Sequence, residues 1–180
     1  SQELHDLSFR YALAVDSRNA AGLAALFTPS GALASFPEGR VRYSGEDGWR
    51  RMIEEVSASF AETMHNVHNQ TFERDDAGVV TGLTTGIASH LAGSGEKGLT
   101  VLDFAMRYHD RYAVHDGEWK FAERRLEVDD ALVVLENIQR RRREGLAAGA
   151  PPRRGAPPGV LTRPAPTATQ KKVILTINRQ

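Results

Sequence analysis

The sequence predicts an α+β fold: a cone-shaped α+β barrel in which N-terminal helices pack on a curved, mainly antiparallel sheet. Two observations lead to this fold class. Apolar residues recur every three or four positions near the start of the chain, whereas long segments rich in β-formers, separated by turn signals, follow from residue 63 on. Helices followed by an antiparallel meander are typical of α+β domains with the helices on one face of the sheet.

The first 60 residues predict three helices. The first covers residues 2–15, the second covers 20–27, and the third begins after Ser44, a residue type that favours helix N-caps. Residues 32–36 and 40–43 predict two short strands joined by a turn. The first helix is marked by an apolar face that consists of Leu4, Leu7, Tyr11, Ala14 and Val15.

Four long strands are expected after the helices, over residues 63–74, 78–92, 99–115 and 118–128. The turn before the last strand contains Asp116-Gly117, a strong signal for a tight hairpin. An earlier turn, at residues 93–98, matches Gly-x-Gly-x-x-Gly. Because a strand and not a helix follows it, this turn is interpreted as a hairpin loop rather than a dinucleotide site.

Composition narrows the class of protein. The chain has no cysteine, which excludes disulfides and thiolate metal sites. No apolar run approaches the roughly 20 residues that a membrane span requires, so no membrane partner is expected. The N-terminal residues lack the features of a signal peptide, and we therefore expect a cytoplasmic protein.

Charge divides the chain into a domain over residues 1–130 and a basic, Gly/Pro-rich extension over 131–180. Residues 137–180 carry ten basic residues and one acidic residue, although the whole chain has a formal net charge of zero. We do not expect nucleic acid as a partner, because this basic segment contains no aromatic residue on which bases would stack. Residues 171–178 predict a terminal strand that docks at a sheet edge, on its own or a neighbouring subunit.

Three residues at separate places suggest acid–base chemistry. Asp16 follows the first helix, His65 lies near the start of the first long strand, and His90 lies near the end of the next. A carboxylate that accepts a hydrogen bond from an imidazole orients the ring and stabilises its protonated form. The alternatives remain open: Asp16 can cap the second helix, and both histidines can simply pack in the sheet.

Alternation along the strands assigns further side chains to faces. His65 and His68 are three residues apart and so point to opposite faces, which argues against a shared metal ion; no metal site is expected. Asn69 is expected on the His65 face, where it would contact a substrate. Phe104, Met106 and Tyr108 share one face of a later strand, where they form core or line an apolar cavity.

Four pieces of sequence resemble the nuclear transport factor 2-like, or SnoaL-like, superfamily over residues 3–128. They are RYALAVD at 10–16, the segment at 23–31, ETMH at 62–65 and DGEWKF at 116–121. The motif match is closest to scytalone dehydratase, hexachlorocyclohexane dehydrochlorinase and bile-acid 7α-dehydratase, which place an Asp and a His where Asp16 and His65 stand here. The same resemblance adds Tyr11, five residues before Asp16, and His90 as candidate catalytic residues.

This resemblance implies a cofactor-independent, dehydratase-like lyase. His65 would take a proton from carbon, Asp16 would hold its other N–H, and Tyr11, Tyr43 or His90 would donate a hydrogen bond to the departing oxygen. The expected substrate is small, cyclic and largely apolar, such as a steroid or polyketide. A double-bond isomerase, a polyketide cyclase and a non-catalytic binding or assembly module of this fold are the alternatives. The resemblance also implies a homo-oligomer, a trimer or a dimer.

Overall fold

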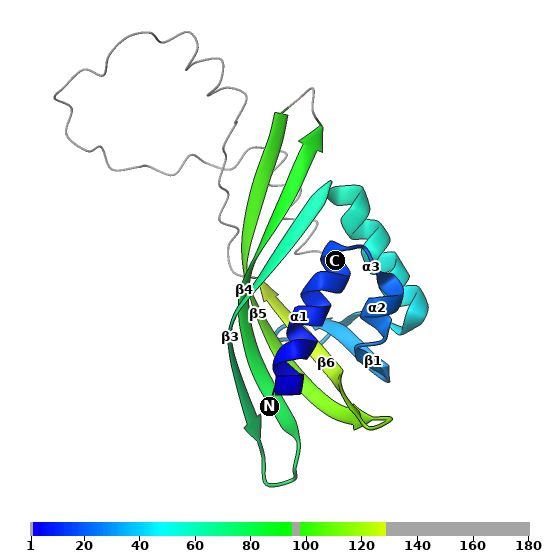
Figure 1. Ribbon diagram of the computed structural model, residues 1–180, viewed down its shortest axis with the longest axis vertical. Coiled ribbons are helices and arrows are strands. Elements are labelled where there is room, and N and C mark those ends of the chain that lie inside the picture. The colour runs from blue at the N-terminus through cyan, green and yellow to red at the C-terminus, as the bar shows by residue number, and fades with distance from the viewer. Residues whose placement is uncertain (1, 95–97, 129–180) are drawn as a thin grey trace, which may run out of the picture.

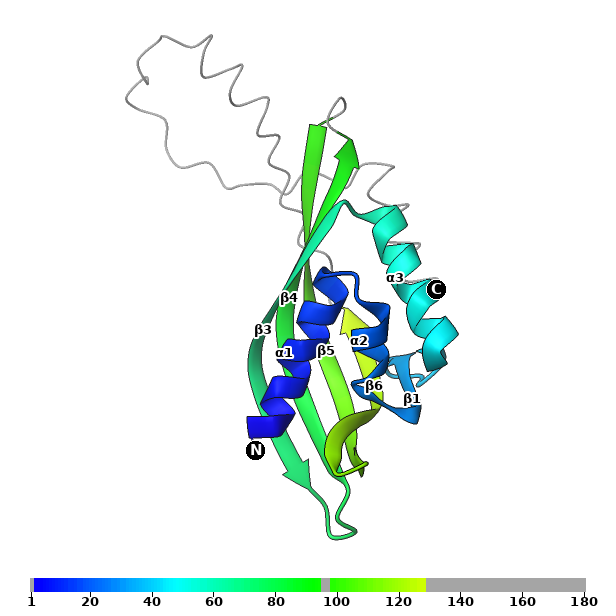
Figure 2. The same ribbon diagram turned by 45° about the vertical axis from the view of Figure 1, so that its right-hand side comes forward.

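The computed structural model describes residues 2–94 and 98–128 of the chain. These residues form three helices and a six-stranded sheet. The sheet is curved, and the helices cover one of its faces (Figures 1 and 2). The α+β fold class expected from the sequence is therefore confirmed. The extension expected over residues 131–180, with its terminal strand, lies outside the described residues. None of the helices within the described ranges has the length and apolar character needed to cross a membrane.

The helices begin and end close to their expected positions. They are α1 (Gln2–Asp16), α2 (Ala20–Ala24) and α3 (Gly45–Ser59). α2 is shorter than expected because Phe27 already begins a strand. Asn19 caps α2 by accepting a hydrogen bond from the Gly22 N–H at 2.8 Å. Ser44 precedes α3 as expected, but its side chain makes no capping hydrogen bond.

The sheet has the strand order β2-β1-β6-β5-β4-β3. All neighbouring strands are antiparallel except β1 and β6, which are parallel. The strand β3 therefore forms one edge of the sheet, and α1 packs beside it (Figure 2). The strands are β1 (Phe27–Ser35), β2 (Val41–Ser44), β3 (Glu62–Arg74), β4 (Val80–Ser94), β5 (Gly98–His115) and β6 (Glu118–Val128).

A bulge interrupts β3 between Val67 and Gln70, where two residues of β3, His68 and Asn69, oppose only Thr85 of β4. The Asn69 backbone N–H donates to the Thr85 hydroxyl at 3.2 Å. The extra residue reverses the alternation of side chains along the rest of the strand, so Asn69 is exposed. The expectation that Asn69 shares the face of His65 was wrong, because simple alternation does not allow for the bulge.

The core lies between the helices and the concave face of the sheet. Along β5 the expected stripe is buried, with Phe104, Met106 and Tyr108 each less than a tenth exposed. Tyr11 of α1 packs edge-on against Tyr108, with 5.8 Å between ring centroids, and against Phe121 of β6 at 6.1 Å. These aromatic contacts fix α1 across the sheet, and with it the position of the residue that ends this helix.

Candidate active site

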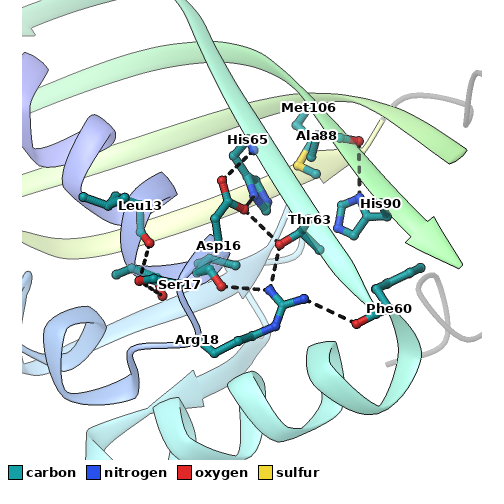
Figure 3. A network of polar contacts seen from close by, with 12 residues as sticks. Leu13, Asp16, Ser17, Arg18, Phe60, Thr63, His65, Ala88, His90 and Met106 are labelled. Carbon is teal, nitrogen blue, oxygen red and sulfur yellow. Dashed lines mark hydrogen bonds and ion pairs between the residues drawn. The ribbon is translucent and has the colours of Figure 1, made fainter.

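Asp16 and His65 meet where the end of α1 reaches the start of β3 (Figure 3). The Nδ1 atom of His65 lies 2.7 Å from Oδ1 of Asp16, although the two residues are 49 positions apart. His65 faces α1 because it alternates with the exposed Met64 on this part of β3. The structure thus brings together the carboxylate and the imidazole that the sequence singled out.

The Asp16 carboxylate accepts three hydrogen bonds. Oδ1 accepts hydrogen bonds from the His65 ring and, at 2.9 Å, from the Thr63 hydroxyl. Oδ2 accepts a hydrogen bond from the His65 backbone N–H at 2.8 Å. Burial by itself would raise the pKa of Asp16, but the hydrogen bonds from His65 and Thr63 outweigh it and hold the pKa below the ordinary value of 3.8. Asp16 is therefore ionised at neutral pH and can only accept, so His65 carries its hydrogen on Nδ1.

The alternative role for Asp16, capping α2, is excluded because Asn19 occupies that position. Two residues of the same network, Thr63 and Arg18, were not assigned a role from the sequence. Thr63 donates to Asp16 and accepts a hydrogen bond from Arg18 at 2.7 Å. Arg18 lies two residues after Asp16, and Thr63 lies two residues before His65. This closeness in sequence was the signal that could have included both residues in the site.

A groove with a volume of about 480 Å³ runs between α1 and β3 and reaches the pair. Part of its wall is apolar, and Phe9 and Leu13 on this side of α1 are 49% and 68% exposed. The side chains of Asp16 and His65 are 22% and 11% exposed. Within the described part of the chain, Nε2 of His65 has no hydrogen-bond partner. The pair is thus half-buried and has one nitrogen available.

His90 lies beside this pair, with 5.5 Å between the centroids of its ring and that of His65. Phe60 and Phe104 meet the His90 ring edge-on. Burial, followed by the nearby charge of His65, lowers the pKa of His90 from 6.5 to about 4. Nδ1 of the neutral ring lies 3.2 Å from the Ala88 carbonyl, which can only accept, so Nε2 of His90 is a hydrogen-bond acceptor.

None of the three candidate tyrosines forms a hydrogen bond with Asp16 or His65 among the described residues. Tyr11 belongs to the aromatic core, and burial raises its pKa well above 10.0. The Tyr43 hydroxyl donates to Glu55 of α3, on the side of the sheet opposite β3 in strand order. The Tyr108 hydroxyl donates to the sulfur of Met106 at 3.2 Å, and burial raises its pKa to about 12. Among these expected substrate contacts, Phe104 approaches the pair most directly, through His90.

A second polar cluster, not expected from the sequence, lies inside the core. Arg124 of β6 donates through Nε and Nη2 to the two carboxylate oxygens of Asp110, each at 2.8 Å. The two side chains are 1% and 0% exposed. The Arg124 guanidinium also lies 4.4 Å from the centroid of the Tyr11 ring and 4.2 Å from that of Tyr108.

No group of three or more His, Cys, Asp or Glu side chains in the described ranges is arranged to hold a metal ion.

The model of the SnoaL-like domain matches residues 1–125, which include Asp16, His65 and His90. The chain belongs to the SnoaL-like domain family. This family assignment confirms the resemblance noted from the sequence. No curated protein matches the chain.

Solved structures share the fold of this SnoaL-like domain. One is a protein from Novosphingobium aromaticivorans whose name provisionally assigns it to the scytalone dehydratases. It is 20% identical, covering 75% of this chain and 87% of its own, with a TM-score of 0.61. Another is the hexachlorocyclohexane dehydrochlorinase LinA-type3 from Novosphingobium barchaimii. It is 22% identical, and the match covers 74% of this chain and 88% of the dehydrochlorinase, with a TM-score of 0.61. ActVI-ORFA from Streptomyces coelicolor is 18% identical, and the match covers 72% of this chain and 94% of ActVI-ORFA, with a TM-score of 0.57.

Proposed function

We propose that this SnoaL-like domain is a cofactor-independent lyase of the dehydratase type, in which His65 removes a proton from carbon. The observation that carries the proposal is the 2.7 Å contact between His65 Nδ1 and a carboxylate that already accepts two other hydrogen bonds. A general base needs a free lone pair and a fixed orientation, and this arrangement supplies both. The names of the dehydratase and the dehydrochlorinase that share the fold denote eliminations, which supports the same reaction class.

The proposed reaction begins when Nε2 of His65 accepts the proton of a carbon next to a carbonyl group. The electron pair of the C–H bond becomes the new carbon–carbon double bond, and the neighbouring C–O bond breaks with its pair going to oxygen. The resulting imidazolium of His65 returns the proton to this oxygen, so that water leaves. Asp16 stabilises the imidazolium through Nδ1–H while it exists.

His90 has a different role in this proposal from the one expected from the sequence. Its neutral ring already donates Nδ1–H to the Ala88 carbonyl, so Nε2 cannot donate to a departing oxygen. It instead packs as a neutral neighbour against the ring of His65, since it is buried and does not line the groove. The apolar residues of the groove, Phe9, Leu13 and Val67, favour a largely apolar cyclic substrate of the steroid or polyketide kind.

The test uses cyclic β-hydroxyketones of two-ring to four-ring size, with formation of the conjugated enone followed by absorbance. We expect turnover by the wild-type chain and a loss of about 10²–10⁴-fold in kcat for His65→Gln, since a positioned general base contributes that much. Asp16→Asn is expected to lose turnover while still binding the compound. Binding of these ketones without any conversion would instead indicate a non-catalytic module.

His115→Gln is the matched control, because His115 lies at the far end of β5, is partly exposed and does not line the groove. It should retain wild-type turnover. The corresponding β,γ-unsaturated ketones separate the isomerase alternative, because conversion of these compounds alone would replace elimination by double-bond migration. Enone formation that persists in His65→Gln would contradict the proposed role of the imidazole.

A further inference from the structure

The end of α1 adopts a Schellman motif centred on Arg18. The Asn19 N–H donates to the Ala14 carbonyl at 2.8 Å, and the Arg18 N–H donates to the Val15 carbonyl at 3.1 Å. This motif requires a left-handed backbone at the residue where Arg18 stands, and its φ is 58°. Glycine usually occupies that position, because a side chain makes the left-handed conformation unfavourable.

The Arg18 side chain explains why an arginine is found at this strained position. Its Nη1 donates to the Val15 carbonyl at 2.9 Å and to the Thr63 hydroxyl at 2.7 Å. Its Nη2 donates to the Phe60 carbonyl at 3.4 Å. One guanidinium thus ties the last turn of α1 to the first residues of β3, and these two segments carry Asp16 and His65 (Figure 3).

The direction of the hydrogen bonds is fixed by chemistry. A guanidinium has no acceptor, so Arg18 must donate to the Thr63 oxygen. The Thr63 hydroxyl hydrogen is then free to point to Asp16, whose ionised carboxylate can only accept. Arg18 therefore orients the Thr63 hydroxyl, which in turn holds Oδ1 of Asp16 where it meets His65 Nδ1.

We propose that Arg18 and Thr63 are positioning residues that hold Asp16 against His65 and so fix the Nδ1–H tautomer of that imidazole. This inference rests on the proposed function for its effect on turnover, but its structural part can be tested without a substrate. Two-bond ¹H–¹⁵N NMR spectra report which ring nitrogen of His65 carries the hydrogen. The His65→Gln spectrum assigns the signals.

Four variants separate positioning from general stability. Arg18→Gly relieves the left-handed strain while removing the guanidinium, so its Tm should equal or exceed that of the wild type. Thr63→Val removes the hydroxyl at almost constant shape, whereas Thr63→Ser keeps it. Arg18→Lys keeps the charge but loses the planar group that serves several acceptors at once.

We expect Arg18→Gly and Thr63→Val to give a mixture of His65 tautomers and to lower kcat about tenfold to a hundredfold with little change in KM. Thr63→Ser should keep the single tautomer and the kcat of the wild type. Arg18→Lys should give values between those of the wild type and Arg18→Gly. Thr71→Val, at an exposed threonine of the same strand, is the matched control and should behave as wild type.

A pure Nδ1–H tautomer in both Arg18→Gly and Thr63→Val would overturn the proposal. Tautomer mixing accompanied by loss of the folded spectrum would also count against it, because it would show that the network maintains the fold rather than the pair. Because this NMR readout needs no substrate, it decides the inference even where His65→Gln retains turnover and the proposed elimination is wrong.

Discussion

Two carboxylates in this domain, Asp16 and Asp110, are each surrounded by hydrogen-bond donors, and they differ in how their networks end. Asp110 accepts two bonds from Arg124, one from Tyr112 and a longer one from Thr84, and both ionic side chains are completely buried. Asp16 accepts three bonds, but its strongest partner is an imidazole whose second nitrogen is unpartnered among the described residues.

The difference separates an ion pair whose charges are fully neutralised from the pair to which we assign acid–base chemistry in the proposed function. In the Asp110 cluster the charge is neutralised by Arg124, and Asp110 raises the pKa of Arg124 despite its burial, so Arg124 keeps its proton at neutral pH. In the Asp16 cluster the carboxylate fixes the tautomer of a group that can gain a proton. Partial exposure to the groove lets a ligand reach this group. The first network is completed by its own partners, whereas in the proposed function the unpartnered Nε2 of His65 serves as the base.

The largest effect on stability is expected from breaking the Asp110 cluster. Arg124→Met leaves Asp110 buried without its cation and should lower the free energy of unfolding by about 3–5 kcal/mol. Replacing both residues, with Arg124→Met and Asp110→Leu, should recover much of that loss because no charge is then left unpaired. Urea denaturation of the wild type, the single variant and the double variant measures these free energies of unfolding. Arg125→Met, at the neighbouring partly exposed arginine, is the control and should cost less than about 1 kcal/mol.

The second effect concerns His90 and has a defined pH window. Since its pKa is about 4 in the folded chain and 6.5 as the ordinary value, the unfolded chain binds a proton between these values and the folded chain does not. Stability is therefore full above pH 6.5 and falls as the pH drops to about 4, by roughly 3 kcal/mol in total. His90→Phe should flatten this dependence, as measured by denaturation at several pH values. An unchanged slope in that variant would assign the pH dependence to another group.

Periodicity predicted most of the fold but not the local features that build the site. The long strands begin and end within a few residues of their expected positions, because alternation and turn residues mark them directly. The burial of Asp110 was also within reach, since it alternates with Tyr108 and Tyr112 on β5. The bulge that exposes Asn69 and the left-handed Arg18 depend on tertiary contacts, and no pattern in the sequence encodes them.

Asp16→Asn is expected to have a smaller effect on stability than either core substitution. The carboxylate is partly exposed, so losing the charge in its three hydrogen bonds should cost about 1 kcal/mol at pH 7. Because the folded pKa is below 3.8, this contribution is present above that value and disappears as the pH falls through the folded pKa. The difference between wild type and variant should therefore shrink in acid. Asp6→Asn, at an exposed position of α1, should show no such difference.

The smallest effect on stability is expected in the groove, where it sharpens the contrast between the two networks. Leu13 is 68% exposed, so Leu13→Ser should change the free energy of unfolding by less than about 0.5 kcal/mol. If an apolar substrate reaches His65 along this groove, the same substitution should raise KM several-fold and leave kcat nearly unchanged, because it removes binding area without touching the Asp16–His65 pair. Val114→Ser, at an exposed apolar residue of β5 outside the groove, provides the comparison for a lost surface side chain. Equal KM values for wild type and Leu13→Ser would mean that the substrate approaches the imidazole from the side of His90 instead.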